Sequence, residues 1–166
     1  MQKVGLVVWL MTAACAVGQS MDPSMVKFFN GSWSCAGEFA NGRTIAADVA
    51  FRSELDGKWL VSSHTDRPPG PYKALSTWGV DRESGKLIAV IDDIAGGVRL
   101  FTSDGWANGA VTFERASILE QKPRRERFRY QQQSPDSFKM TYEVSGPEGP
   151  WKMGDYIVCT RPRQSP

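Results

Sequence analysis

The feature that most constrains the fold is the alternation of apolar and polar residues in short runs from Ser32 onward. Turn pairs such as Asn41-Gly42, Asp56-Gly57 and Asn108-Gly109 separate these runs at intervals of about ten residues. Such pairs connect neighbouring antiparallel strands through tight loops, so the pattern predicts an antiparallel meander. We expect ten strands, at residues 32–40, 44–53, 57–66, 72–80, 86–92, 97–103, 109–117, 124–132, 136–144 and 151–161.

The way such a meander ends decides between two architectures. Ten consecutive antiparallel strands form either a sandwich or an up-and-down barrel, and closure into a barrel removes the exposed strand edges. No shift in composition divides the 166 residues, so we expect one all-β domain over residues 19–166. Before the first strand, Asp22 can cap a short helix that has Pro23 in its first turn. We expect this helix to plug one end of the barrel.

The first residues have the anatomy of a secretory signal peptide. Lys3 gives a positive start, and residues 4–17 form an uncharged, mostly apolar run of about 14 residues, which is too short for a membrane span. Small residues suit cleavage after Ala16 or after Gly18. We therefore expect residues 1–18 to be a signal peptide and the mature chain to be exported, to the periplasm or the extracellular space.

Cysteine usage adds one alternative and one constraint. The residues before Cys15 resemble a bacterial lipobox, so a lipid anchor at Cys15 that holds the protein in the envelope is the alternative to simple cleavage. The mature domain then holds only Cys35 and Cys159. An even pair in an oxidising compartment predicts a disulfide, and two separate buried thiols are the alternative.

The expected disulfide fixes how the barrel closes. If Cys35 lies opposite Cys159 in an antiparallel pair, Trp33 lies opposite Arg161 in the same register. A cation then stacks on the indole ring. Because these residues belong to the first and last strands, their pairing predicts a closed barrel.

Several short segments resemble those of a known superfamily. The segment Gly31-Ser32-Trp33 resembles the Gly-x-Trp start of the lipocalin and calycin superfamily, in which a basic residue of the last strand covers the Trp, a role that Arg161 fits. The wider layout resembles a bacterial exported family of unknown function with lipocalin-like barrels. No Thr-Asp-Tyr second motif occurs and ten strands exceed the roughly eight of lipocalins, so the resemblance is to the broad superfamily. The matching segments are Gly31-Ser32-Trp33, Gly57-Lys58-Trp59-Leu60-Val61, Trp78-Gly79-Val80-Asp81, Asp104-Gly105-Trp106, Arg125-Glu126-Arg127-Phe128-Arg129-Tyr130, Tyr142-Glu143-Val144-Ser145, Trp151 and Tyr156-Ile157-Val158-Cys159.

A lipocalin-like barrel implies an interior that can hold a ligand, and strand alternation indicates which side chains line it. On the face shared with Cys159, the last strand contributes Met153, Asp155 and Ile157. Tryptophans in such positions either contact a ligand or pack in the core. Our candidate ligand-binding residues are Trp59, Trp78, Phe128, Tyr130, Met140, Tyr142 and Arg127.

The eighth strand separates its side chains sharply. Phe128 and Tyr130 lie on one face, and Arg125, Arg127 and Arg129 lie on the other. Three arginines either form a solvated outer face or, if they point inward, an anion clamp. The sequence leaves both placements open.

Catalysis, metal binding and nucleic-acid binding find little support. The 20 Lys and Arg residues exceed the 18 Asp and Glu residues by only +2, too little to indicate a nucleic-acid partner. His64 is the single histidine, no Gly-x-Ser-x-Gly nucleophile motif occurs, and no zinc-type cysteine spacing occurs. Barrel haem proteins of similar layout carry their ligand histidine near the C-terminus, where this chain has none. We therefore expect no enzyme activity, no metal and no cofactor.

Two hypotheses about function remain. The first is an exported protein that binds a small apolar or amphipathic molecule inside the barrel. The second is a packed barrel without a ligand that serves as a structural or interaction module of the envelope. The sequence does not indicate the ligand or the oligomeric state.

Overall fold

A computed structural model describes residues 20–117 and 124–162 of the chain. All ten expected strands form, each within about two residues of its predicted bounds. The proposed signal peptide and Cys15 lie outside the described residues. The elements are α1 (Pro23–Phe29), β1 (Gly31–Phe39), β2 (Thr44–Glu54), β3 (Trp59–Asp66), β4 (Lys73–Val80), β5 (Leu87–Asp93), β6 (Val98–Ser103), β7 (Ala110–Ser117), β8 (Arg124–Ser134), β9 (Ser137–Ser145) and β10 (Lys152–Thr160).

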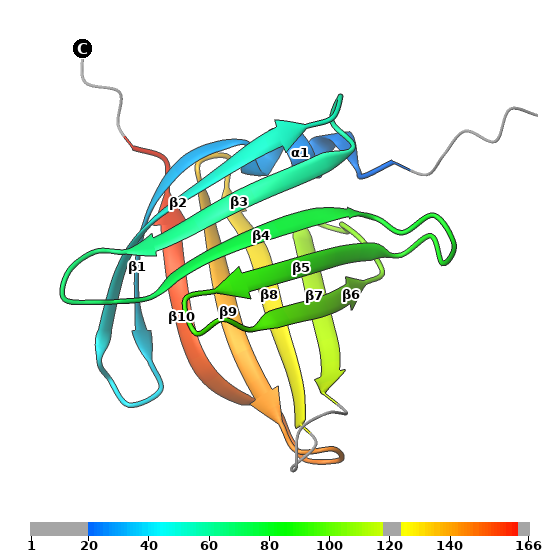
Figure 1. The fold of residues 1–166 in the computed structure, drawn as a ribbon. Coiled ribbons are helices and arrows are strands. Elements are labelled where there is room, and N and C mark those ends of the chain that lie inside the picture. The colour runs from blue at the N-terminus through cyan, green and yellow to red at the C-terminus, as the bar shows by residue number, and fades with distance from the viewer. Residues whose placement is uncertain (1–19, 118–123, 163–166) are drawn as a thin grey trace, which may run out of the picture.

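The strands form a closed antiparallel barrel in which each strand pairs with the next and β1 pairs with β10 (Figure 1). Cys35 lies opposite Cys159, and the two form a disulfide. The predicted closure and the predicted register are therefore both confirmed. Because β1 and β10 pair along their length, the barrel has no open sheet edge between them.

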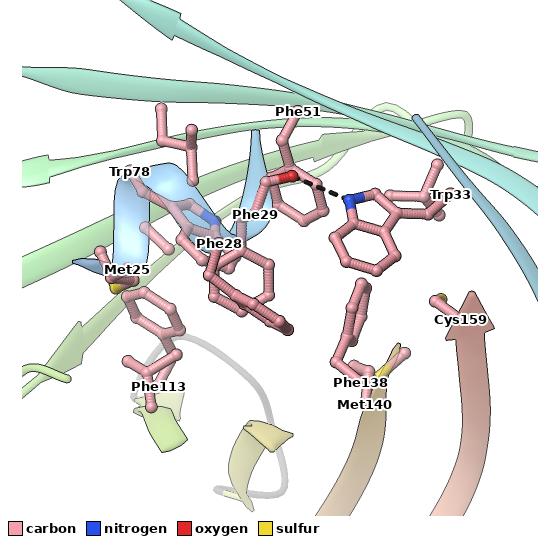
Figure 2. Packing of buried hydrophobic residues seen from close by; sticks show 14 of the residues in the cluster. Met25, Phe28, Phe29, Trp33, Phe51, Trp78, Phe113, Phe138, Met140 and Cys159 are labelled. Carbon is pink, nitrogen blue, oxygen red and sulfur yellow. Dashed lines mark hydrogen bonds between the residues drawn. The ribbon is translucent and has the colours of Figure 1, made fainter. Parts of the chain in front are cut away.

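The helix α1 closes one end of the barrel, as expected. The Asp22 carboxylate accepts a hydrogen bond of 2.7 Å from the Ser24 amide, which caps the helix. The buried residues of α1 are Met25, Phe28 and Phe29. The Trp33 indole of β1 donates a 2.8 Å hydrogen bond to the Phe29 carbonyl (Figure 2). The end of α1 is thereby fixed to the first strand. No helix in the described part of the chain is long and apolar enough to span a membrane.

Arg161, which directly follows β10, anchors the same end of the barrel. Its guanidinium lies 4.2 Å from the centre of the Trp33 ring, which confirms the predicted stack. It also donates hydrogen bonds to the carbonyls of Phe28 and Asn30, at 2.7 and 3.2 Å. Carbonyls at a helix C-terminus have no partners within the helix, so Arg161 supplies them while it covers the tryptophan.

Aromatic side chains fill the barrel next to the helix. Phe29 is fully buried, and its ring centre lies 5.1–5.9 Å from the ring centres of five residues of the barrel wall and loops. Figure 2 shows Phe29 between Phe51 and Trp78, with Phe138 and Trp33 on the other side of the cluster. The core is therefore concentrated at this end. The five neighbours are Phe51, Trp78, Trp106, Tyr130 and Phe138.

Candidate functional site: a cavity at the open end of the barrel

The barrel is hollow at the end opposite α1. A cavity of about 800 Å³ begins above the aromatic core and opens between the β1–β2 hairpin and the loop that joins β3 to β4. Phe51, Tyr130 and Phe138 belong to both the core and the cavity wall, so the aromatic cluster forms the cavity floor. The interior is thus packed at one end and open at the other.

The lower wall of the cavity is apolar because inward positions of the strands carry apolar residues. Inward and outward side chains alternate along a strand, so residues two apart face the same side. In β9, Phe138 and Met140 are buried and line the cavity, and Ile157 of β10 lies opposite Met140. The other apolar residues of this wall are Ile45, Val49, Ala74, Ile91 and Phe128.

Polar side chains gather near the mouth of the cavity and mostly pair with one another. The His64 Nε2 lies 2.9 Å from the Asp66 Oδ1, and Arg99 donates a 2.9 Å hydrogen bond to Asp93. Arg99 also donates to the Tyr72 hydroxyl at 3.3 Å. Burial raises the pKa of Tyr72, so this hydroxyl stays protonated at neutral pH. The mouth therefore offers polar groups that are already fixed in position.

Asp155 differs from these paired groups. It lines the cavity from β10, and no hydrogen bond or ion pair satisfies its carboxylate within the described residues. Burial, with a smaller contribution from the negative charge of Asp66, raises the pKa of Asp155 to about 6. The cavity wall thus carries a carboxyl group whose charge has no counterion in the part of the chain that the structure describes.

A buried carboxylate, Glu126, lies next to the cavity. It accepts hydrogen bonds from the Tyr142 hydroxyl at 2.7 Å and from Arg115, and it forms an ion pair with Arg124 at 2.8 Å. Burial alone would raise the pKa of Glu126, but the hydrogen bonds from Arg115 and Tyr142, together with the positive charges of Arg115 and Arg124, outweigh burial and lower the pKa. This network fixes the Tyr142 ring, one of whose neighbours is Phe128 at 4.8 Å between ring centres.

Four of the seven candidate ligand-binding residues line the cavity. These are Phe128, Tyr130, Met140 and Tyr142. Trp78 points into the barrel but belongs to the aromatic core, where it is 1% exposed and donates a 3.0 Å hydrogen bond to the Ser76 hydroxyl. Of the two roles considered for Trp78, the structure gives it core packing.

Trp59 and Arg127 do not reach the cavity, which corrects their expected placement. The buried neighbour of Trp59 is Leu60, so the indole points outward, where it covers Gly79 of β4. Arg127 lies outside between Glu143, at 2.6 Å, and the ring of Trp151, at 4.2 Å.

Of the two placements left open for the arginines of β8, the structure has the outer face. Arg125 also lies over Trp151, at 4.8 Å from the ring centre, and Arg129 is exposed. The buried residue between Arg125 and Arg127 is Glu126, as strand alternation requires. The basic face therefore does not form an anion clamp within the barrel.

Sequence reasoning missed most of the polar mouth. Tyr72 and Arg99 line the cavity but were not among the candidates. Alternation could have placed both on the inner face, because Tyr72 lies two residues before Ala74 and Arg99 lies two residues before the buried Phe101. His64 was considered only as a catalytic or haem-binding residue. Asp155 was expected inside the barrel and lies there.

The described residues hold no group of three or more His, Cys, Asp or Glu side chains that could hold a metal ion. Their geometry instead combines an apolar floor, aromatic walls and a few fixed polar groups. Ligand pockets in proteins have this composition, and their volumes are commonly about 300–1,000 Å³.

Comparisons with known proteins show similarity to other β-barrels at the level of the fold. No protein-family model matches the chain, and no curated protein matches it. Among solved structures, the crystal structure of Rv2717c from M. tuberculosis is similar with a TM-score of 0.56 and 14% identity, over 87% of this chain and 100% of that chain. This likeness supports the barrel fold.

Two engineered barrels are also similar. A de novo designed fluorescence-activating β-barrel gives a TM-score of 0.47 and 12% identity, over 82% of this chain and 96% of that chain. The redesigned barrel mFAP1, which was solved with DFHBI bound, gives a TM-score of 0.45 and 11% identity, over 82% of this chain and 97% of that chain.

Proposed function

We propose that this protein binds one small apolar or amphipathic molecule inside the barrel. The observation that carries the proposal is the cavity of about 800 Å³, which is apolar at its floor and polar at its mouth. Water forms no hydrogen bonds with the apolar floor, whereas a ligand with an apolar body removes that floor from water and makes dispersion contacts with it. The polar mouth then orients the end of the ligand that stays near solvent.

We further propose that the protein works outside the cytoplasm. The disulfide between Cys35 and Cys159 suits an oxidising compartment. The signal peptide expected at residues 1–18 supports the same location, with a lipid anchor at Cys15 as the alternative. An exported barrel of this kind fits a carrier or scavenger of a poorly soluble molecule.

Filling the cavity is expected to remove binding. Ala74 of β4 lines the cavity, whereas the preceding residue, Lys73, is exposed on the outer face of the same strand. Ala74→Trp should weaken binding of the neutral apolar probe N-phenyl-1-naphthylamine at least about tenfold, because the indole occupies the space of the ligand. Fluorescence titration of the mature protein measures the change.

Lys73→Trp is the matched control, since it adds the same side chain one residue away on the outside and the probe is uncharged. It should leave probe binding within about twofold of the unmodified protein. Equal loss in both variants would contradict a site inside the barrel. Absence of saturable binding to the unmodified protein would favour the alternative, a structural or interaction module without a ligand.

A further inference from the structure

Three arginines and three aspartates line the cavity, but among the described residues no cation pairs with Asp155. Arg99 is paired with Asp93, and His64 lies against Asp66. Two further arginines, Arg43 and Arg67, lie at the exposed rim. Their charges are screened by solvent, whereas the partly buried charge of Asp155 acts in a less polar environment.

The rim arginines also have other contacts. Arg43 lies 4.6 Å from the centre of the Phe39 ring. Arg67 donates a 3.1 Å hydrogen bond to the Cys35 carbonyl and lies 3.6 Å from Asp48. Neither arginine therefore supplies the counterion that Asp155 lacks within the described residues.

Aromatic rings flank the Asp155 carboxylate on both neighbouring strands. Asp155 of β10 lies directly opposite Phe39 of β1 on one side and Tyr142 of β9 on the other. Both aromatic residues line the cavity. Residues directly opposite in antiparallel strands have Cβ atoms about 4.5–5.5 Å apart and point to the same face. A carboxylate between two rings is the arrangement that attracts an organic ammonium group, through charge pairing and cation–π contact.

The backbone of β10 is shaped to place these groups together. A register shift between Met153 and Asp155 leaves Gly154 without a partner in β9. A Cβ atom at Gly154 would lie 2.9 Å from Cδ1 of Tyr142, so the glycine lets the tyrosine ring lie against the strand beside Asp155.

We propose that the cavity selects a ligand that carries a protonated amine, with its apolar body on the cavity floor and its ammonium group paired with the Asp155 carboxylate between Phe39 and Tyr142. This inference rests on the proposed function and names the ligand class for the same cavity. Uncharged and acidic ligands of the same shape are the classes that the site disfavours, because they leave the carboxylate unpaired or repel it.

The pairing has a defined pH dependence. Because the pKa of Asp155 is raised to about 6, its carboxyl group is charged at pH 7.5 and largely protonated at pH 5. Affinity for an ammonium ligand therefore rises as the pH rises through about 6. The other titratable and charged groups that line the cavity around Asp155 are Arg43, His64, Asp66, Arg67, Tyr72, Asp93, Arg99, Tyr130 and Tyr142.

The test uses three dansyl probes that share one alkyl chain and differ only at its end, which is an ammonium, an uncharged methyl or a carboxylate group. With the mature protein at pH 7.5, the ammonium probe should bind at least about tenfold more tightly than the methyl probe, and the carboxylate probe should bind most weakly. At pH 5 the preference for the ammonium probe should fall about tenfold.

Asp155→Asn keeps the shape of the side chain and removes its charge. It should abolish the ammonium preference and leave the methyl probe within about threefold. Asp92→Asn, on the exposed outer face of β5, is the control for the loss of one negative charge and should keep the preference. The thermal midpoint of unliganded Asp155→Asn at pH 7.5 should equal or exceed that of the unmodified protein, since an unpaired, partly buried charge is removed.

The outcomes separate this inference from the proposed function. Equal binding of the three probes, or preference for the carboxylate probe, would overturn the amine assignment while the binding function stands. The same holds if Asp155→Asn keeps the ammonium preference. If the methyl probe and both charged probes fail to bind in a saturable way, the proposed function itself fails.

Discussion

Replacing Cys35 and Cys159 together with alanine is expected to lower the free energy of unfolding by about 4–5 kcal/mol. The disulfide joins positions 124 residues apart, so its loss releases a long loop in the unfolded chain. Such a loss is a large part of the stability of an ordinary domain. Denaturant unfolding of the mature protein, followed by far-UV circular dichroism, measures the change.

Reduction provides the control for this prediction. Dithiothreitol should destabilise the unmodified protein by a similar amount and should leave the double variant unchanged, because that variant has no bond between β1 and β10 to reduce. If the double variant loses less than about 1 kcal/mol, the covalent closure of the barrel contributes little and strand pairing alone holds β1 to β10.

Phe29→Ala is expected to lower the free energy of unfolding by about 3–5 kcal/mol. The Phe29 ring is fully buried and packs against Phe138, which belongs to the aromatic floor of the cavity, so its removal leaves a void in the core. Lys27→Ala, an exposed position of the same helix, should change stability by less than about 0.5 kcal/mol. A small loss in Phe29→Ala would show that the helix covers the barrel without closing it.

The strands and the closure of the barrel could be predicted because alternation and turn chemistry are local. Turns such as Asn108-Gly109 bring φ angles of 52° and 73°, which few other residue pairs adopt at low cost. The Cys35–Cys159 register then followed from the cysteine count, and the Trp33–Arg161 contact followed from the register.

Departures from strict alternation could not be predicted. Met153 was expected inside the barrel, but the register shift at Gly154 turns it outward, where it is 43% exposed, and keeps Asp155 inside. Trp59 faces outward because its buried neighbour Leu60 pairs with Trp78. A large aromatic residue suits either face of a strand, so only the register could decide its side.

The cavity itself was only partly predictable. Alternation placed Met140 and Tyr142 inside, but the pairing of Arg99 with Asp93 joins side chains of two strands, β6 and β5, and depends on their register. Whether the interior is filled depends on the total volume of the inward side chains across all ten strands. Sequence alone therefore left a packed barrel and a hollow barrel as alternatives.

The position of a bound probe shows whether the interior of the barrel binds a ligand. Met140 lines the cavity, whereas Met153 lies exposed on β10, so their ¹³C-labelled methyl groups report on the inside and on the outside in one NMR spectrum. At saturation with N-phenyl-1-naphthylamine, we expect a ring-current shift of the Met140 methyl resonance and an unchanged Met153 resonance. An unchanged Met140 resonance at saturation, or a shift confined to Met153, would contradict a ligand-binding interior.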